Sequence, residues 1–80
     1  MNTQVTQHPL SAIELLAEAM TYAHGDNQTD IIEVITSVWL PVFKSEHNLK
    51  MALEALKTSH DSVNARVMCE RYLDVMRSVQ

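Results

Sequence analysis

The central segment, residues 31–43 (IIEVITSVWLPVF), is the feature that most constrains the fold of this chain. Its β-branched residues are common in strands, but polar and apolar residues do not alternate along it as they would in a half-buried strand. At about 100° per residue, its apolar side chains instead fall mainly on one side of a helix. The segment therefore predicts a helix over residues 28–40. That helix kinks or stops at Pro41, because proline lacks an N–H and its ring clashes with the preceding turn.

The rest of the chain also favours helices. Its 80 residues include one Gly and two Pro, so tight turns are few and long helices joined by short polar loops are favoured. Capping residues and apolar spacing place helices at residues 12–24, 28–40, 46–58 and 61–79. Short loops favour antiparallel neighbours. The sequence predicts an all-α fold, a small four-helix bundle of up-down antiparallel topology, with the second helix at its centre.

The helix ends carry specific signals. Ser11 and Glu14 have the spacing of a capping box, in which each side chain accepts a hydrogen bond from the other residue's backbone N–H. Gly25 can take the left-handed conformation that ends a helix. The N-caps that we expect for the four helices are, in order, Ser11, Asn27, Ser45, and either Ser59 or Asp61.

Length and composition bound the class of protein. We expect residues 1–8, which are polar and aperiodic, to form a flexible arm, and residues 9–80 to form a single helical domain. The N-terminus has no basic segment followed by an apolar one, and the central apolar run is shorter than the roughly 20 residues that span a bilayer. A single cysteine cannot form an internal disulfide. These features predict a cytoplasmic protein that does not span a membrane.

Residues that could carry chemistry are scattered. No two histidines have the spacing of a zinc motif, and Cys69 lies on an apolar stripe without a recognisable base beside it. We therefore expect no enzyme and no cofactor. In an antiparallel bundle, however, one end would bring together His24, Asp26, His60 and Asp61. A metal- or small-ligand-binding module at that end is an alternative, although caps and turns are the usual role of such residues.

Charge is distributed unevenly along the chain. The net charge is −4, and all five charged residues before Lys44 are acidic: Glu14, Glu18, Asp26, Asp30 and Glu33. Neutralising phosphates requires clustered Lys and Arg, whereas the arginines of the last helix alternate with acidic residues. We therefore do not expect nucleic-acid binding, and a small helical DNA-binding regulator remains an alternative.

Apolar surface beyond the needs of one small core is the remaining feature. The candidate interface residues are Trp39, Leu40, Phe43, Met51, Val63 and Val67. We expect a non-enzymatic protein–protein interaction module, either a homodimer or a small adaptor or inhibitor that docks on a larger protein through apolar helix faces. The five acidic residues would form a surface that steers a basic partner. An acidic inhibitor of a nucleic-acid-handling enzyme is one form of this hypothesis.

Overall fold

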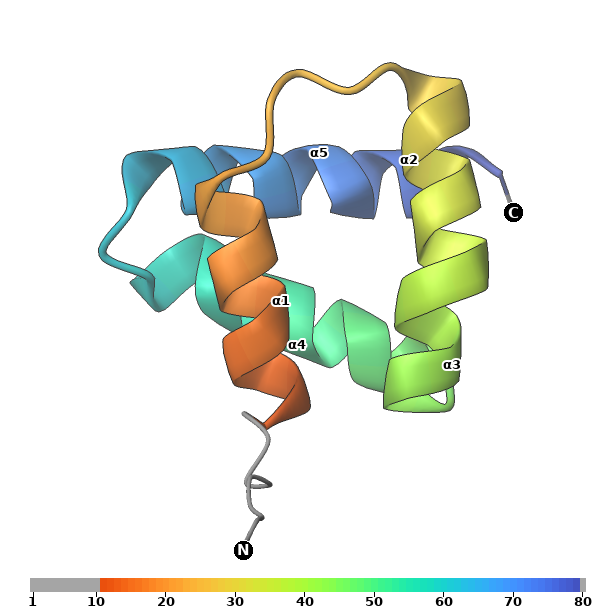
Figure 1. Ribbon diagram of the computed structural model, residues 1–80, viewed down its shortest axis with the longest axis horizontal. Coiled ribbons are helices and arrows are strands. Elements are labelled where there is room, and N and C mark those ends of the chain that lie inside the picture. The colour runs from red at the N-terminus through yellow and green to blue at the C-terminus, as the bar shows by residue number, and fades with distance from the viewer. Residues whose placement is uncertain (1–10, 80) are drawn as a thin grey trace, which may run out of the picture.

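The computed structural model describes residues 11–79, which form helices and contain no strand (Figure 1). The elements are α1 (Ala12–Thr21), α2 (Gln28–Val34), the π-helical turn η2 (Ile35–Trp39), α3 (Leu40–Phe43), α4 (Glu46–Ser59) and α5 (Val63–Ser78). The prediction of an all-α fold is confirmed. None of the described helices is both long and apolar enough to cross a membrane. The arm expected at residues 1–8 lies outside the described residues.

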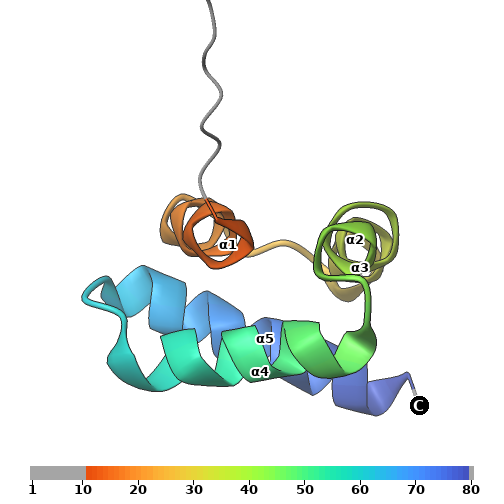
Figure 2. The ribbon, with the colours of Figure 1, turned by 90° about the horizontal axis from the view of Figure 1, so that it is seen from below.

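The helices form two layers. α4 and α5 lie side by side and antiparallel, and α1 and the continuous helix made of α2, η2 and α3, here called the α2–α3 rod, both lie across one face of that pair (Figures 1 and 2). α1 packs on α5, while the rod packs on α5 through α2 and on α4 through α3. An up-down bundle of four nearly parallel helices is therefore not confirmed.

The centre of the structure is α5, which contacts α4, α1 and α2. Its buried residues are Ala65, Met68, Cys69, Tyr72, Leu73 and Met76. The expectation that the second helix is central was wrong, because the rod packs through one side only. That side carries residues spaced four apart: Ile31, Ile35, Trp39 and Phe43.

The proline does not end the rod at residue 40. In the π turn that precedes Pro41, the N–H of Leu40 donates to the carbonyl of Ile35, five residues back. The hydroxyls of Thr36 and Ser37 each donate to the carbonyl four residues earlier, at 2.7 and 2.6 Å. Pro41 then occupies the first turn of α3, where a missing N–H costs little, so the helix continues to Phe43. The wider π turn also keeps residues spaced four apart on one side.

Four side chains cap the helix starts. The acceptors are Ser11, Asn27, Ser45 and Ser62, at 2.9–3.2 Å from the backbone N–H three residues on. The capping box is confirmed, since the Oε1 of Glu14 also accepts from the N–H of Ser11 at 3.1 Å. For the last helix, Ser59 and Asp61 were the wrong choices, because α4 continues to Ser59 and the helix begins two residues later than expected.

The end of α1 is capped by a side chain that is distant in the sequence. Gly25 does not have positive φ, and α1 ends at Thr21 rather than residue 24. The Nδ2 of Asn64, in the first turn of α5, lies 3.3, 2.9 and 3.0 Å from the carbonyl oxygens of Met20, Thr21 and Ala23. A side chain on α5 therefore takes the capping role that the sequence predicts for glycine.

We expect Asn64→Ala to lower the free energy of unfolding by about 1 kcal/mol, because several carbonyls at the end of α1 lose their donor. The corresponding fall in Tm is about 4–8 °C for a domain of this size, measured by circular dichroism. Gly25→Ala is the control. A Cβ there would meet only the Nη1 of Arg71, at 3.8 Å, so no loss of stability is expected. An unchanged Tm for Asn64→Ala would show that water satisfies these carbonyls equally well.

A second prediction concerns Lys44, which ends α3 with φ of 69° and is the one non-glycine residue of positive φ among those described. Since this conformation costs a side-chain-bearing residue about 1–2 kcal/mol, Lys44→Gly should stabilise the protein by up to about 1 kcal/mol after glycine's greater unfolded-state entropy is subtracted. Lys44→Val should destabilise it. Urea denaturation of the parent and the two variants measures both changes. A Lys44→Gly variant less stable than the parent would contradict the left-handed conformation of Lys44.

Candidate docking surface

Many large apolar side chains remain exposed on this small domain. Those of the described residues are Ile13, Leu15, Tyr22, Val38, Val42, Met51, Val63, Val67 and Val79. Several of them line grooves in different parts of the molecule. The charged residues beside each groove determine whether that groove could bind one partner in preference to others.

The structure does not bring the six predicted interface residues together. Trp39 and Phe43 are only 7% and 9% exposed, so the prediction that they are surface anchors was wrong. They belong to the buried stripe of the rod, with ring centroids 6.3 Å apart, and the buried indole Nε1 of Trp39 has no hydrogen-bond partner within residues 11–79. Leu40 is half-buried and lines a narrow groove of about 90 Å³ beside the end of α5.

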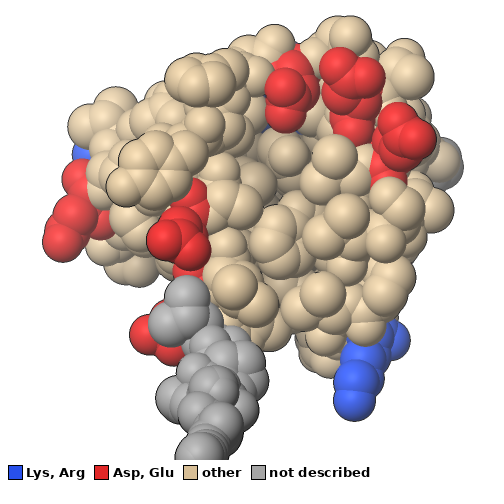
Figure 3. Space-filling model, viewed as in Figure 1, with Lys and Arg blue, Asp and Glu red and all other residues tan. Residues whose placement is uncertain are grey.

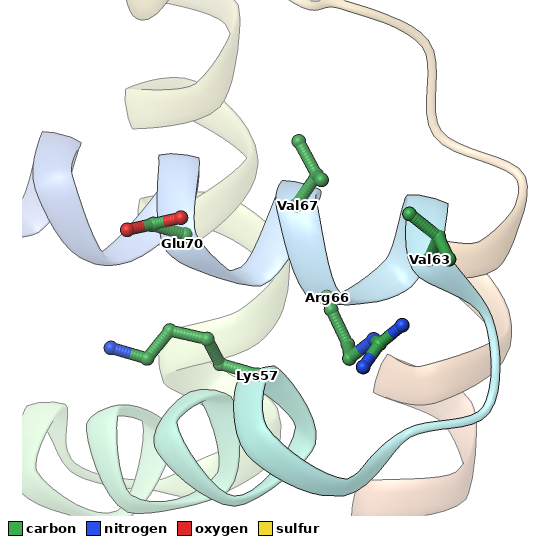
Figure 4. Close-up of a pocket in the computed structure, with 5 residues that line it drawn as sticks. All are labelled: Lys57, Val63, Arg66, Val67 and Glu70. Atoms are coloured by element: carbon green, nitrogen blue, oxygen red, sulfur yellow. The ribbon is translucent and has the colours of Figure 1, made fainter.

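Val63 and Val67 line a groove between α4 and α5, on the face turned away from α1 and the rod (Figure 4). This groove has a volume of about 240 Å³, and its other lining residues are Lys57, Arg66 and Glu70. Lys57 is already paired with Glu54 at 3.2 Å. Because charges of both signs surround the two valines, the groove offers little electrostatic selectivity.

Met51 lines a third groove, here called the α1–α3 groove, of about 480 Å³. Its lining residues come from the start of α1, the end of α3 and from α4. Its lining residues are Ile13, Phe43, His47, Asn48, Met51, Ala52 and Ala55. The Nδ2 of Asn48 donates to the carbonyl of Phe43 at 3.1 Å and so fixes the end of α3 to α4. The lining of the α1–α3 groove is mostly apolar, and the volume of this groove is larger than that of either of the other two grooves.

The rod turns a row of valines toward α1. Val34, Val38 and Val42 each lie one position before a residue of the buried stripe, which places them on one flank of the rod. Residues one position after the stripe, among them Thr36 and Leu40, line the narrow groove beside the end of α5. The valine flank must therefore face the other way, toward α1. Val38 and Val42 remain 44% and 39% exposed there.

α1 presents the equivalent flank to the rod. Two antiparallel helices on the same face of a layer are related by a local two-fold axis, so each turns the same flank toward the other. On α1 that flank carries Leu15, one position before the buried Leu16, and Leu15 is 40% exposed. The surface between the two helices is hollowed and uncharged (Figure 3). We call this surface, with walls at Leu15, Val38 and Val42, the apolar valley.

Acidic side chains surround the apolar valley. Glu14 and Glu18 on α1 and Asp30 and Glu33 on the rod are all exposed. Acidic groups gather at the upper end of the rod and lie beside α1, and a basic group lies at the lower end of the rod (Figure 3). Asp26, the fifth of the predicted steering residues, is half-buried, and its carbonyl accepts a hydrogen bond from the Nη2 of Arg71 at 2.6 Å. Neither α1 nor the rod contains Lys or Arg, and Lys44 follows the last residue of the rod, so the charges along the two helices beside the valley are all negative except at that end.

The residues proposed as an alternative metal site do not form one. Within residues 11–79, no three His, Cys, Asp or Glu side chains are placed to hold a metal ion together. The Nδ1 of His60 accepts a hydrogen bond from the N–H of Ser62 at 2.9 Å. His60 therefore serves the turn before α5. His24, Asp26 and Asp61 are not joined to it in a ligand set.

Burial keeps the one cysteine unreactive. Cys69 is fully buried, and desolvation raises the pKa of its thiol from 9.0 to about 11. The thiol is therefore protonated at neutral pH and cannot act as a nucleophile. Burial also raises the pKa of Tyr72, with smaller contributions from the negative charges of Asp26 and ionised Cys69.

The raised pKa of Cys69 predicts a loss of stability in alkali. Between about pH 9, where the unfolded thiol ionises, and about pH 11, the folded state holds more protons, so the free energy of unfolding falls as pH rises. Tyr72 acts in the same direction. Urea denaturation over this range should show a steeper decline for the parent than for Cys69→Ala, whose stability at neutral pH is lower because of the cavity. Parallel declines would contradict the role of the thiol.

Comparisons with protein-family models, with curated proteins and with solved structures found no match to this chain.

Proposed function

We propose that this chain is a non-enzymatic protein-interaction module whose docking surface is the apolar valley. The observation that carries the proposal is the exposed row of Leu15, Val38 and Val42 along facing flanks of two helices. The buried stripes of α1 and the rod pack on α4 and α5 without these side chains. Polar residues could occupy the same flanks at no cost to the core, so the apolar flanks are best explained by an interaction with another molecule.

The openness of the valley favours a macromolecular partner over a small molecule. Sites for small ligands enclose most of the ligand and contain a few converging polar groups. The apolar valley is a hollow on an open face of the molecule, and the acidic residues on the two helices beside it are exposed to solvent. An elongated apolar surface with a charged rim is instead typical of protein interfaces, in which the apolar centre contributes most of the binding free energy.

Self-association through the valley is disfavoured by charge. Two copies related by a two-fold axis would place the same surface against itself, so the acidic crests of one copy would face those of the other. Like charges held close across an interface cost free energy. The homodimer expected from the sequence would therefore require a different face, and the valley itself fits an adaptor or inhibitor that docks on another protein.

The proposal predicts that Val38→Asp with Val42→Asp abolishes partner capture without unfolding the domain. Both side chains are exposed, so the expected loss of stability is within about 1 kcal/mol. A carboxylate in the centre of the interface would be buried without a partner and should prevent docking. The measurement is quantitative affinity capture from lysate of the source cells with immobilised protein.

The matched control is Val63→Asp with Val67→Asp, which introduces the same charges at two exposed valines on the opposite face (Figure 4). This control should capture the same proteins as the parent. The proposal fails if the valley variant retains the partners of the parent, if the control loses them equally, or if the parent captures nothing.

A further inference from the structure

We infer that the occupant of the apolar valley is a single amphipathic α-helix with Lys or Arg along both edges of its apolar stripe. This inference rests on the proposed function and specifies its partner by shape and charge. The shape follows from the two helices that form the walls, and the charge follows from the residues on their crests.

The valley lies between two antiparallel helices, and its position suits a third helix. α1 and the rod are antiparallel, lie on the same face of α4 and α5, and make their main contacts with that layer rather than with each other (Figure 2). The face between these walls is hollowed (Figure 3), and a third helix lying along the hollow would run beside both walls. At the α1–α3 groove its floor includes the small residues Ala52 and Ala55, which permit close approach of a backbone. Helix binding in an apolar groove is a common mode of peptide recognition.

The apolar walls fix the contacts of the bound helix. Val38 and Val42 are four residues apart and so form a ridge along the rod, while Leu15 projects from the opposite wall. Ridges of this spacing receive side chains at positions i, i+3, i+4 and i+7 of a second helix, with axes about 8–10 Å apart. Met51 and Ile13 extend the apolar surface into the α1–α3 groove.

The charges beside the valley determine which side chains the bound helix should carry along its two edges. A helix in the valley would have one edge along α1, which carries the exposed Glu14 and Glu18, and the other along the rod, which carries the exposed Asp30 and Glu33. Lys or Arg on both edges would reach these carboxylates, whereas Asp or Glu would meet like charge. The same negative field repels an anionic lipid surface and nucleic acid. A basic amphipathic helix is therefore the occupant that matches both the apolar walls and the acidic crests.

Designed peptides test this inference directly. One peptide of about 18 residues carries Leu at helical a and d positions and Lys elsewhere, and the second replaces each Lys with Glu. Both carry fluorescein, and anisotropy measures their binding to the full chain. We expect the Lys peptide to bind at least about tenfold more tightly than the Glu peptide, and its affinity to fall several-fold as salt shortens the Debye length.

Variants locate the binding site. Glu18→Lys with Glu33→Lys, which reverses one charge on each crest, should weaken the Lys peptide about tenfold, and so should Val38→Asp. The matched control is Asp61→Lys with Glu70→Lys, which makes the same change in net charge away from the valley and should leave binding within about twofold of the parent. Circular dichroism verifies that each variant is folded.

Each outcome has a definite meaning. Equal binding of both peptides, or equal weakening by the crest and control variants, would overturn the charge selection. The docking function would still be judged by the capture experiment with the double variant Val38→Asp and Val42→Asp. Binding of neither peptide would overturn the helical occupant. A dimer in light scattering that Val38→Asp converts to monomer would overturn the inference in favour of a second copy.

Discussion

Burial of the apolar stripe of α5 is the interaction on which the rest of the structure depends. Three other helices pack against this one element, and six of its side chains are buried. Each large side chain removed from water contributes about 1.5–3 kcal/mol, so this stripe accounts for much of the stability available to so small a domain. α1 and the α2–α3 rod each pack on the layer that α5 forms with α4, and their main contacts are with that layer rather than with each other. The valley between them is a consequence of that arrangement.

Polar contacts to α5 also set the spacing of the two upper helices. Asn64 holds the end of α1, and Arg71 holds the carbonyl of Asp26 further along the same helix. Gln28, the first residue of α2, donates to the hydroxyl of Ser78 near the end of α5, at 3.3 Å. The connection between α1 and the rod is thus attached to α5 at successive points and follows its length (Figure 1). The width of the valley is determined by α5 and does not depend on direct packing of its walls.

Local sequence signals predicted the helices, whereas contacts between residues far apart in the chain determine how the helices end and pack. Helical spacing and capping residues identified all four helical segments, because both act within one or two turns of chain. The contacts of Asn64 join residues more than 40 positions apart, and no local pattern indicates them. The same limit applies to the candidate site. Periodicity placed Val38 on the same side as Trp39, but only the position of the rod on its layer shows that one is exposed and the other buried.

The unpaired indole of Trp39 gives the protein an optical reporter in its interior. It is the only tryptophan in the chain, its ring is buried beside Phe43, and its Nε1 has no hydrogen-bond partner among the described residues, so the excited indole is shielded from relaxation by water. Its emission should therefore lie toward the blue and shift to the red when the rod separates from α4 and α5. Val38 precedes Trp39 in the sequence and lies in the wall of the valley. A small movement of that wall would therefore change the fluorescence emission of Trp39.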